Sequence, residues 1–300
     1  MNRLFPTPPH RAGLLMLAAL ASLSTLPGTV RADAAAIRTD FKTLYAGSCP
    51  EDRANAMEPL YTCAKAELLF VQIPGMPWLS RLIAQSVILP MFSEVLGKKR
   101  LPPLAPGEAA EARYLELLKT LIRGSGGPSG EELAMIDFSA SLTGCDENNR
   151  SRESNRPWPE HFGPLLQLCL THTLSREGEA HPPAPSGGFI VIDTGKRKIL
   201  TFGDLILPGR EKALETLQRD AFRIYLKAQG DMTDAAIEEH LATPPFAFHL
   251  GKNWRIARDG LIFGYAMYEI GPRPFGTPEI FIPRHDLQGI VQPGILAHVP

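Results

Sequence analysis

The chain has 300 residues, of which 44% are hydrophobic and 21% charged, and its formal net charge is −1 at pH 7. This composition is typical of a globular protein that can bury a sizeable core in one large domain or two of ordinary size. The mildly acidic balance argues against nucleic acid as a partner and against a polybasic contact with a membrane surface.

The first 32 residues have the layout of a signal peptide. Arg3 and Arg11 flank an apolar run over residues 12–26, which is followed by the small-residue ending Val30-Arg31-Ala32. The run is shorter than the roughly 20 residues that a membrane-spanning helix needs. We therefore expect cleavage after Ala32, a periplasmic or secreted protein, and no transmembrane segment in the mature chain. A retained anchor is the alternative. Cleavage removes three arginines and changes the formal net charge from −1 to −4.

Four cysteines remain after cleavage, and an even number in an exported chain indicates two disulfides, for which three pairings exist. We expect each cysteine to pair with its neighbour in the sequence, Cys49 with Cys63 and Cys145 with Cys169. Their spacing contains neither a Cys-x-x-Cys unit nor a neighbouring pair of histidines, so it predicts no metal site.

Residues 33–164 form the first of two predicted parts. The periodicity of apolar residues predicts a strand over 62–73, a helix over 78–87, a helix over 108–123 and a strand over 133–142. The helix over 108–123 carries a stripe of apolar residues that we expect to face the core. The stripe consists of Ala112, Leu115, Leu118, Leu121 and Ile122.

Residues 165–300 form the second predicted part. Strands are expected over 165–174 and 189–193, and helices over 211–228 and 233–241. Thr233 is the expected N-cap of the second helix, whose Ile237 and Leu241 should face inward.

A β-meander is predicted after these helices. Asp259-Gly260 stands between two apolar runs and predicts a two-residue hairpin turn. Pro272, Pro274 and Gly276 then predict an ordered loop before a strand that begins at Glu279. Together these elements predict an α+β fold, with antiparallel sheets and helices packed on one side, rather than a doubly wound parallel sheet.

Blocks of sequence over residues 165–288 resemble the C-terminal domain of the RsiV-like family. The blocks are Gly178-Glu-Ala-His181, Asp193-Thr-Gly-Lys196, Leu200-Thr-Phe-Gly-Asp204-Leu205, Asp259-Gly-Leu-Ile-Phe263, Tyr268-Glu-Ile-Gly-Pro272 and Ile280-Phe-Ile-Pro283. That family includes a lysozyme-binding anti-sigma factor and the accessory region of some peptidoglycan deacetylases. The resemblance implies a two-part RsiV-like architecture with a protein-binding face built from loops. It does not extend to the anti-sigma role, because the chain has no sigma-binding cytoplasmic segment.

The sequence predicts no catalytic residues, no metal and no cofactor. Its histidines after residue 160 are scattered and include no His-Glu-x-x-His unit. Gly127-Pro-Ser-Gly-Glu departs from the Gly-x-Ser-x-Gly elbow at its last position. We therefore favour a protein that is not an enzyme.

Two loops carry the candidate partner-binding residues. Glu179 and His181 lie in one loop, and Tyr268, Arg273 and Phe275 lie in the other. Structural roles are the alternatives, since His181 can bind its own loop backbone and Tyr268 can pack at a strand end.

The hypothesis is an exported, non-enzymatic binding protein of the cell envelope whose partner is a lysozyme-type muramidase or peptidoglycan. An enzyme or accessory domain acting on peptidoglycan, or an immunity protein against a wall-degrading toxin, are the alternatives.

Overall fold

The computed structural model describes residues 39–47, 64–124, 136–145, 159–176, 186–229 and 232–300, which form the expected α+β fold. The predicted signal peptide, the Cys49–Cys63 pair, Glu179 and His181 lie outside these residues. Within the described ranges, no helix has the length and apolar character needed to cross a membrane.

The larger sheet has seven strands. Their order is β1 (Asp40–Gly47), β2 (Lys65–Gln72), β3 (Ile136–Thr143), β5 (Leu165–Arg176), β6 (Ser186–Asp193) and β7 (Lys198–Ile199), and β4 (Glu160–Phe162) pairs beside β5. Strands from both sides of residue 165 share this sheet, and the division of the chain into residues 33–164 and 165–300 stays a prediction.

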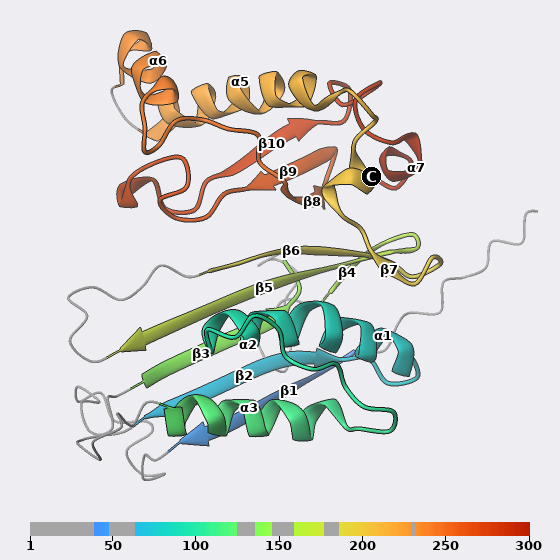
Figure 1. Cartoon of the computed structure of the whole chain (residues 1–300). Helices are drawn as coiled ribbons and strands as arrows, with labels where there is room; N and C mark the ends of the chain where they lie inside the picture. Colours follow the sequence, from blue (N-terminus) through green and yellow to red (C-terminus); the bar gives the residue numbers. More distant parts are fainter. Residues whose placement is uncertain (1–38, 48–63, 125–135, 146–158, 177–185, 230–231) are drawn as a thin grey trace, which may run out of the picture. The chain divides into compact units, whose positions relative to one another are not determined.

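One pair in the described part of the larger sheet, β2 and β3, is parallel, and the other pairs are antiparallel. A parallel pair needs a crossover connection. The connection here carries α1 (Pro77–Ile83), the π-helical turn η1 (Ala84–Ile88), α2 (Leu89–Val95) and α3 (Ala110–Gly124). These helices cover one face of the sheet (Figure 1).

A first hydrophobic core lies between those helices and the larger sheet. Leu68, Phe138, Leu142 and Leu168 are fully buried there. The residues of α3 that face this core are Tyr114, Leu117, Leu118 and Leu121, whereas Ala112 is exposed and Leu115 only partly buried. The predicted stripe was therefore wrong in part. The reason is that Tyr114 packs edge-on against Phe70, with ring centroids 5.4 Å apart, so the aromatic residue and not Ala112 faces the core.

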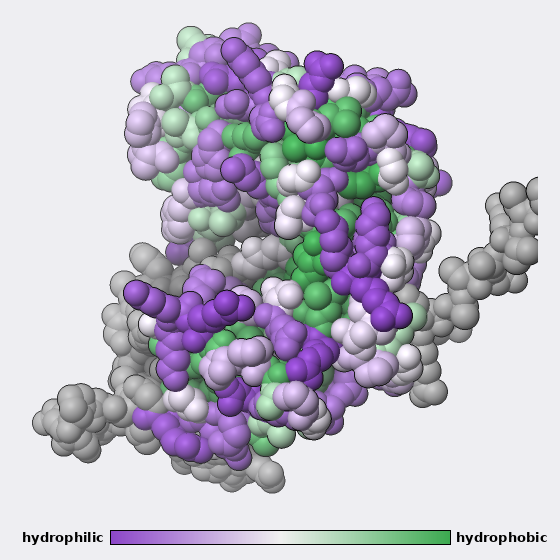
Figure 2. All heavy atoms as spheres, turned by 45° about the vertical axis from the view of Figure 1, so that its right-hand side comes forward, coloured by the Kyte–Doolittle hydropathy of each residue, from purple (hydrophilic) through white to green (hydrophobic). Residues whose placement is uncertain are grey.

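A second core lies on the opposite face of β5 and β6, where Leu165 and Val191 are buried. It is completed by α4 (Phe202–Leu205), α5 (Glu211–Gln229), α6 (Asp234–Ala242), α7 (Pro293–Leu296) and a three-stranded sheet of β8 (Asn253–Ala257), β9 (Gly260–Gly264) and β10 (Glu279–Pro283). Figure 2 shows hydrophobic side chains in the middle of the face that it draws, with hydrophilic ones around them.

The predicted meander is confirmed, because β8, β9 and β10 pair in sequence order and antiparallel. The hairpin turn is Arg258-Asp259, one residue earlier than expected, and Asp259 has φ 64°. Gly260 instead opens β9, where a Cβ atom would lie 2.3 Å from the carbonyl oxygen of Ile282. Glycine is required there by the close approach of β10.

The predicted disulfide between Cys145 and Cys169 is confirmed, with a Cα–Cα distance of 4.9 Å. Cys169 lies on β5 opposite Thr143, the last residue of β3. The bond therefore fastens the chain to the sheet just after it leaves β3.

The predicted N-cap of α6 is confirmed, since Thr233 accepts a hydrogen bond from the Ala236 amide at 3.2 Å. A second cap begins α4, where the Asp204 carboxylate accepts from the amide and hydroxyl of Thr201, both at 2.9 Å. Lys198 also donates to this carboxylate.

A buried glutamine joins the two sheets. Gln167 of β5 is fully buried, and its side-chain amide accepts from the Ile256 N–H at 2.7 Å and donates to the Ile256 carbonyl at 3.1 Å. Nearby, the Phe189 N–H of β6 donates to Asn253 Oδ1 at 2.7 Å. The outer edge of β8 is thus bonded by side chains instead of a further strand.

Replacement of Gln167 by Met should destabilise the protein strongly. The change keeps the side-chain length but leaves two buried backbone groups of Ile256 without a partner, which corresponds to about 2–4 kcal/mol. Urea denaturation of both proteins measures the difference. Gln288→Met, at an exposed position, is the matched control and should change stability by less than about 0.5 kcal/mol. Equal stability of the Gln167 variant and the wild type would contradict the role of this amide.

Replacement of Asp204 by Asn should cost about 0.5–1 kcal/mol at neutral pH, because it weakens the acceptor for Thr201 and removes the charge that faces Lys198. Hydrogen bonds from Lys198 and Thr201 lower the pKa of Asp204 to about 2. Since the folded-state pKa lies below the unfolded value of about 3.9, this stabilisation is present above about pH 4 and is lost as the pH falls toward 2. Denaturation of both proteins at pH 7 and pH 2.5 should therefore show a smaller difference at the lower pH. An unchanged difference would contradict the ionised cap.

Candidate functional site

The candidate site is the connection between β9 and β10, residues 265–278, which we call the β9–β10 loop. Its two ends are joined by a hydrogen bond from the Tyr265 amide to the Pro278 carbonyl at 2.9 Å. A short 3-10 helix, η2 (Arg273–Phe275), follows Pro272, and Gly276 then reverses the chain with φ 63°. The prolines and this glycine thus produce the ordered loop that the sequence predicted.

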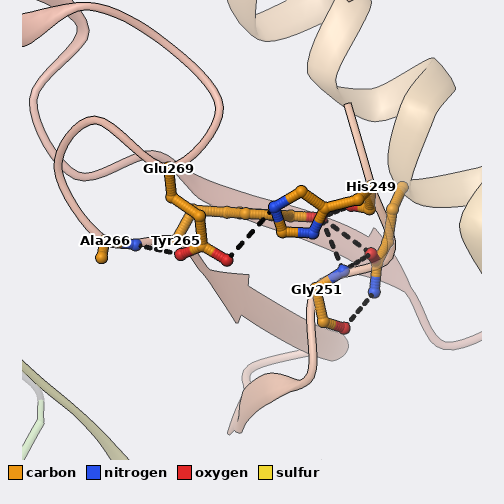
Figure 3. A network of polar contacts seen from close by, with 6 residues as sticks. His249, Gly251, Tyr265, Ala266 and Glu269 are labelled. Carbon is orange, nitrogen blue, oxygen red and sulfur yellow. Dashed lines mark hydrogen bonds and ion pairs between the residues drawn. The ribbon is translucent and has the colours of Figure 1, made fainter. Parts of the chain in front are cut away.

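Glu269 fixes the first half of the loop. Its carboxylate accepts from the Ala266 amide at 2.6 Å and lies 3.5 Å from His249 Nε2 (Figure 3). His249 belongs to the segment before β8, and the hairpin returns the chain so that the two side chains meet. Glu269 therefore connects the loop to a neighbouring stretch of backbone.

A buried polar network lies beneath the pair formed by Glu269 and His249. Gln218 of α5 is fully buried, accepts from the Gly251 amide at 2.7 Å and donates to the Gly251 carbonyl at 3.1 Å. The Tyr265 hydroxyl lies 2.9 Å from Gln218 Oε1 and 3.0 Å from the His249 carbonyl. Figure 3 shows Tyr265 between Glu269 and the segment that contains His249 and Gly251. Burial raises the pKa of Tyr265, so this phenol stays neutral and can donate near pH 7.

Helices α5 and α6 fix the second half of the loop. The Tyr225 hydroxyl donates to the Phe275 carbonyl at 2.7 Å. His240 Nε2 lies 2.9 Å from the Ile270 carbonyl, and because a carbonyl oxygen only accepts, this nitrogen must carry the proton. The Phe275 ring packs edge-on against His240 at 5.5 Å. The loop is thus held at several points along its length.

The three predicted binding residues of this loop differ in accessibility. Tyr268 is 50% exposed. Arg273 is also exposed, whereas Phe275 is half-buried against His240. The structure therefore leaves Tyr268 and Arg273 accessible to solvent and turns Phe275 toward the helices.

Tyr268 has a strained backbone, with φ 67°. A positive φ is uncommon outside glycine, asparagine and aspartate, and it is unfavourable for a bulky residue. Such strain persists only where the surrounding contacts fix the conformation. Glu269 and Ile270, the next two residues, supply those contacts.

An open cavity of about 760 Å³ adjoins the loop, and its lining includes His249, Lys252 and Glu269 together with Glu211. The sequence analysis did not select these residues, because they lie far apart along the chain and come together only in the folded structure. The lining of the cavity thus contains charged side chains of both signs, Lys252 against Glu211 and Glu269. Among the described residues, no group of three or more His, Cys, Asp or Glu side chains could hold a metal ion.

Comparison with known proteins finds one family model that matches part of the chain. Residues 203–285, which include the β9–β10 loop, match the family described as "Protein of unknown function (DUF3298)". No curated protein matches the chain. The narrower resemblance to RsiV-like proteins stays a prediction.

Two solved structures are similar to this chain. A DUF3298 family protein from Pseudomonas aeruginosa PAO1 has a TM-score of 0.54 and 21% identity, over 86% of this chain and 96% of that one. A member of the DUF3298 family from Bacteroides fragilis NCTC 9343 has a TM-score of 0.56 and 15% identity, over 88% of this chain and 97% of that one. At these identities the similarity shows a common fold.

Removal of the Tyr225 hydroxyl should loosen the β9–β10 loop without unfolding the protein. Tyr225→Phe deletes one hydrogen bond to the Phe275 carbonyl, which corresponds to about 0.5–1.5 kcal/mol. Hydrogen exchange followed by mass spectrometry should show faster exchange in peptides that cover residues 270–278. Tyr45→Phe, which changes an exposed tyrosine of β1, should leave exchange in those peptides unchanged. The prediction fails if both variants exchange like the wild type.

Proposed function

We propose that this protein is an exported binding protein of the cell envelope, and that the β9–β10 loop holds a protein partner without catalysis. The observation that carries the proposal is the combination of an exposed, strained Tyr268 with a loop that is otherwise fixed by hydrogen bonds. A loop that is ordered before binding loses little conformational entropy on association. Tyr268 and Arg273 are two of the exposed residues of the loop, and tyrosine and arginine are enriched among residues that dominate binding energy.

Export is supported by two observations. The first 32 residues have the charge and apolar pattern of a signal peptide. The disulfide between Cys145 and Cys169 is of a kind that persists mainly in oxidising compartments. The protein would therefore act in the periplasm or outside the cell.

The proposed partner is a lysozyme-type muramidase. The sequence blocks shared with RsiV-like proteins support this class, and two of those blocks, Asp259–Phe263 and Tyr268–Pro272, flank or form the β9–β10 loop. The net charge of −4 expected for the mature chain favours a basic partner, because charge complementarity accelerates association. Peptidoglycan itself is the competing ligand.

Calorimetric titration of the purified protein with muramidases of several structural types tests this proposal. We expect binding at micromolar or lower concentration by at least one type. Tyr268→Ala and Arg273→Ala should each weaken binding by about 10- to 30-fold, as central tyrosines and arginines do at other interfaces.

Matched controls replace residues of the same kind at distant exposed positions. Tyr45→Ala on β1 and Arg123→Ala on α3 should leave the affinity unchanged. Absence of binding to every muramidase at micromolar concentration would overturn this partner. Binding to purified peptidoglycan sacculi that depends on Tyr268 would replace the muramidase by the cell wall.

A further inference from the structure

A second cavity lies at the end of β2, outside residues 203–285 and independent of the proposed function. Its volume is about 700 Å³, within the range of small-molecule sites. Its walls come from the residues that follow β2, from α1 and from the beginning of α3, which Figure 1 shows near the same end of the larger sheet. We call it the β2-end cavity.

One wall of the β2-end cavity is formed by the turn that leaves β2. The Met76 amide donates to the Ile73 carbonyl at 3.2 Å, and Gly75 lies between them with φ 87°. Pro77 then begins α1. This turn directs α1 away from the strand, so that Trp78 and Ile83 line the cavity.

The opposite wall is the segment between α2 and α3. The Arg81 guanidinium donates to the carbonyls of Leu104 and Ala105. The Leu101 amide donates to the Ser93 hydroxyl at 2.9 Å. Leu101 and Leu104 are buried. These bonds fasten the segment to α1 and α2, and the cavity is open in this structure.

The apolar lining of the cavity consists of the exposed Pro74 and Pro77, the half-buried Trp78 and the buried Phe70 and Tyr114. Phe70 and Tyr114 meet edge to face with ring centroids 5.4 Å apart. Trp78 adds a third ring, with the Arg197 guanidinium 5.3 Å from its centroid. Burial, together with the nearby Glu111 carboxylate, raises the pKa of Tyr114, so its hydroxyl carries no charge at neutral pH.

The charged groups in the lining already have partners within the protein. Glu111 accepts from Lys42 and Gln72, and Glu108 accepts from the Ala105 amide at 2.7 Å. The Arg81 guanidinium is bound to backbone carbonyls. An anionic ligand would meet two carboxylates, and a cation would compete with existing donors.

We infer that the β2-end cavity binds an uncharged, largely apolar molecule, whose ring or alkyl chain lies against the accessible surfaces of Pro74, Pro77 and Trp78. The matching class is an uncharged amphiphile such as a long-chain alcohol. Burial of this apolar surface drives the binding, and the paired charges at the rim exclude ionised relatives of the same chain length.

Titration of the purified protein with the uncharged fluorescent probe N-phenyl-1-naphthylamine tests this inference. We expect a saturable rise in fluorescence. Ala109→Phe, at an exposed position in the lining, should fill the cavity and reduce probe affinity at least 10-fold. Ala112→Phe, on an exposed face of α3 outside the lining, should leave the affinity unchanged. Circular dichroism of both variants verifies that they fold.

Competition identifies the ligand class. Dodecanol should displace the probe, dodecanoate should do so at least 10-fold less well, and the polar, uncharged chitotetraose should not displace it. Probe binding that is absent, or equal in both variants, would overturn the site. Equal competition by dodecanol and dodecanoate, or displacement by chitotetraose, would overturn the ligand class. None of these outcomes depends on muramidase binding.

Discussion

The fold depends on buried glutamine side chains, whose amides form hydrogen bonds that the backbone of a neighbouring strand would otherwise form. The Gln167 amide offers the same donor and acceptor as a peptide group, and it pairs with both polar groups of Ile256. An unpaired strand edge buried between two sheets would leave such groups without partners, and each orphaned group costs more than an average hydrogen bond contributes. With the edge of β8 satisfied in this way, both faces of β5 and β6 can be covered by hydrophobic cores.

Gln218 binds the backbone of Gly251 in the same way and thereby positions the candidate site. Its amide binds both backbone groups of Gly251, while Tyr265, the residue that follows β9, closes the network. A Cβ atom at residue 251 would lie 2.6 Å from the Tyr265 ring, so only glycine allows this approach. Since Tyr265 also begins the β9–β10 loop, the network sets the distance between that loop and His249.

Local sequence patterns predicted the helices and strands that are specified by residues close together in the chain. The helices at 211–229 and 234–242 and the strands of the meander follow from periodicity, capping and turn residues. Gln167 alternates with Leu166 and Leu168, a pattern that predicts a strand but does not show that the glutamine is buried. Its partner Ile256 is distant in the sequence, so no local signal marks it. The apolar residues Leu165 and Val191 on the same face were the available sign that this face is also covered. The pair formed by His249 and Glu269 was missed for the same reason of distance.

The strain at Tyr268 connects the fold to the site. A left-handed backbone costs a residue with a Cβ about 1–2 kcal/mol, and an aromatic ring left half exposed recovers only part of its possible burial energy. The hydrogen bonds at Ala266, Ile270 and Phe275, each contributing about 0.5–1.5 kcal/mol, are sufficient to hold the conformation. Packing alone would favour glycine at this position. The stability of the fold alone does not require a tyrosine here, and a half-exposed ring held in place by its neighbours is what the proposed contact with a partner would use.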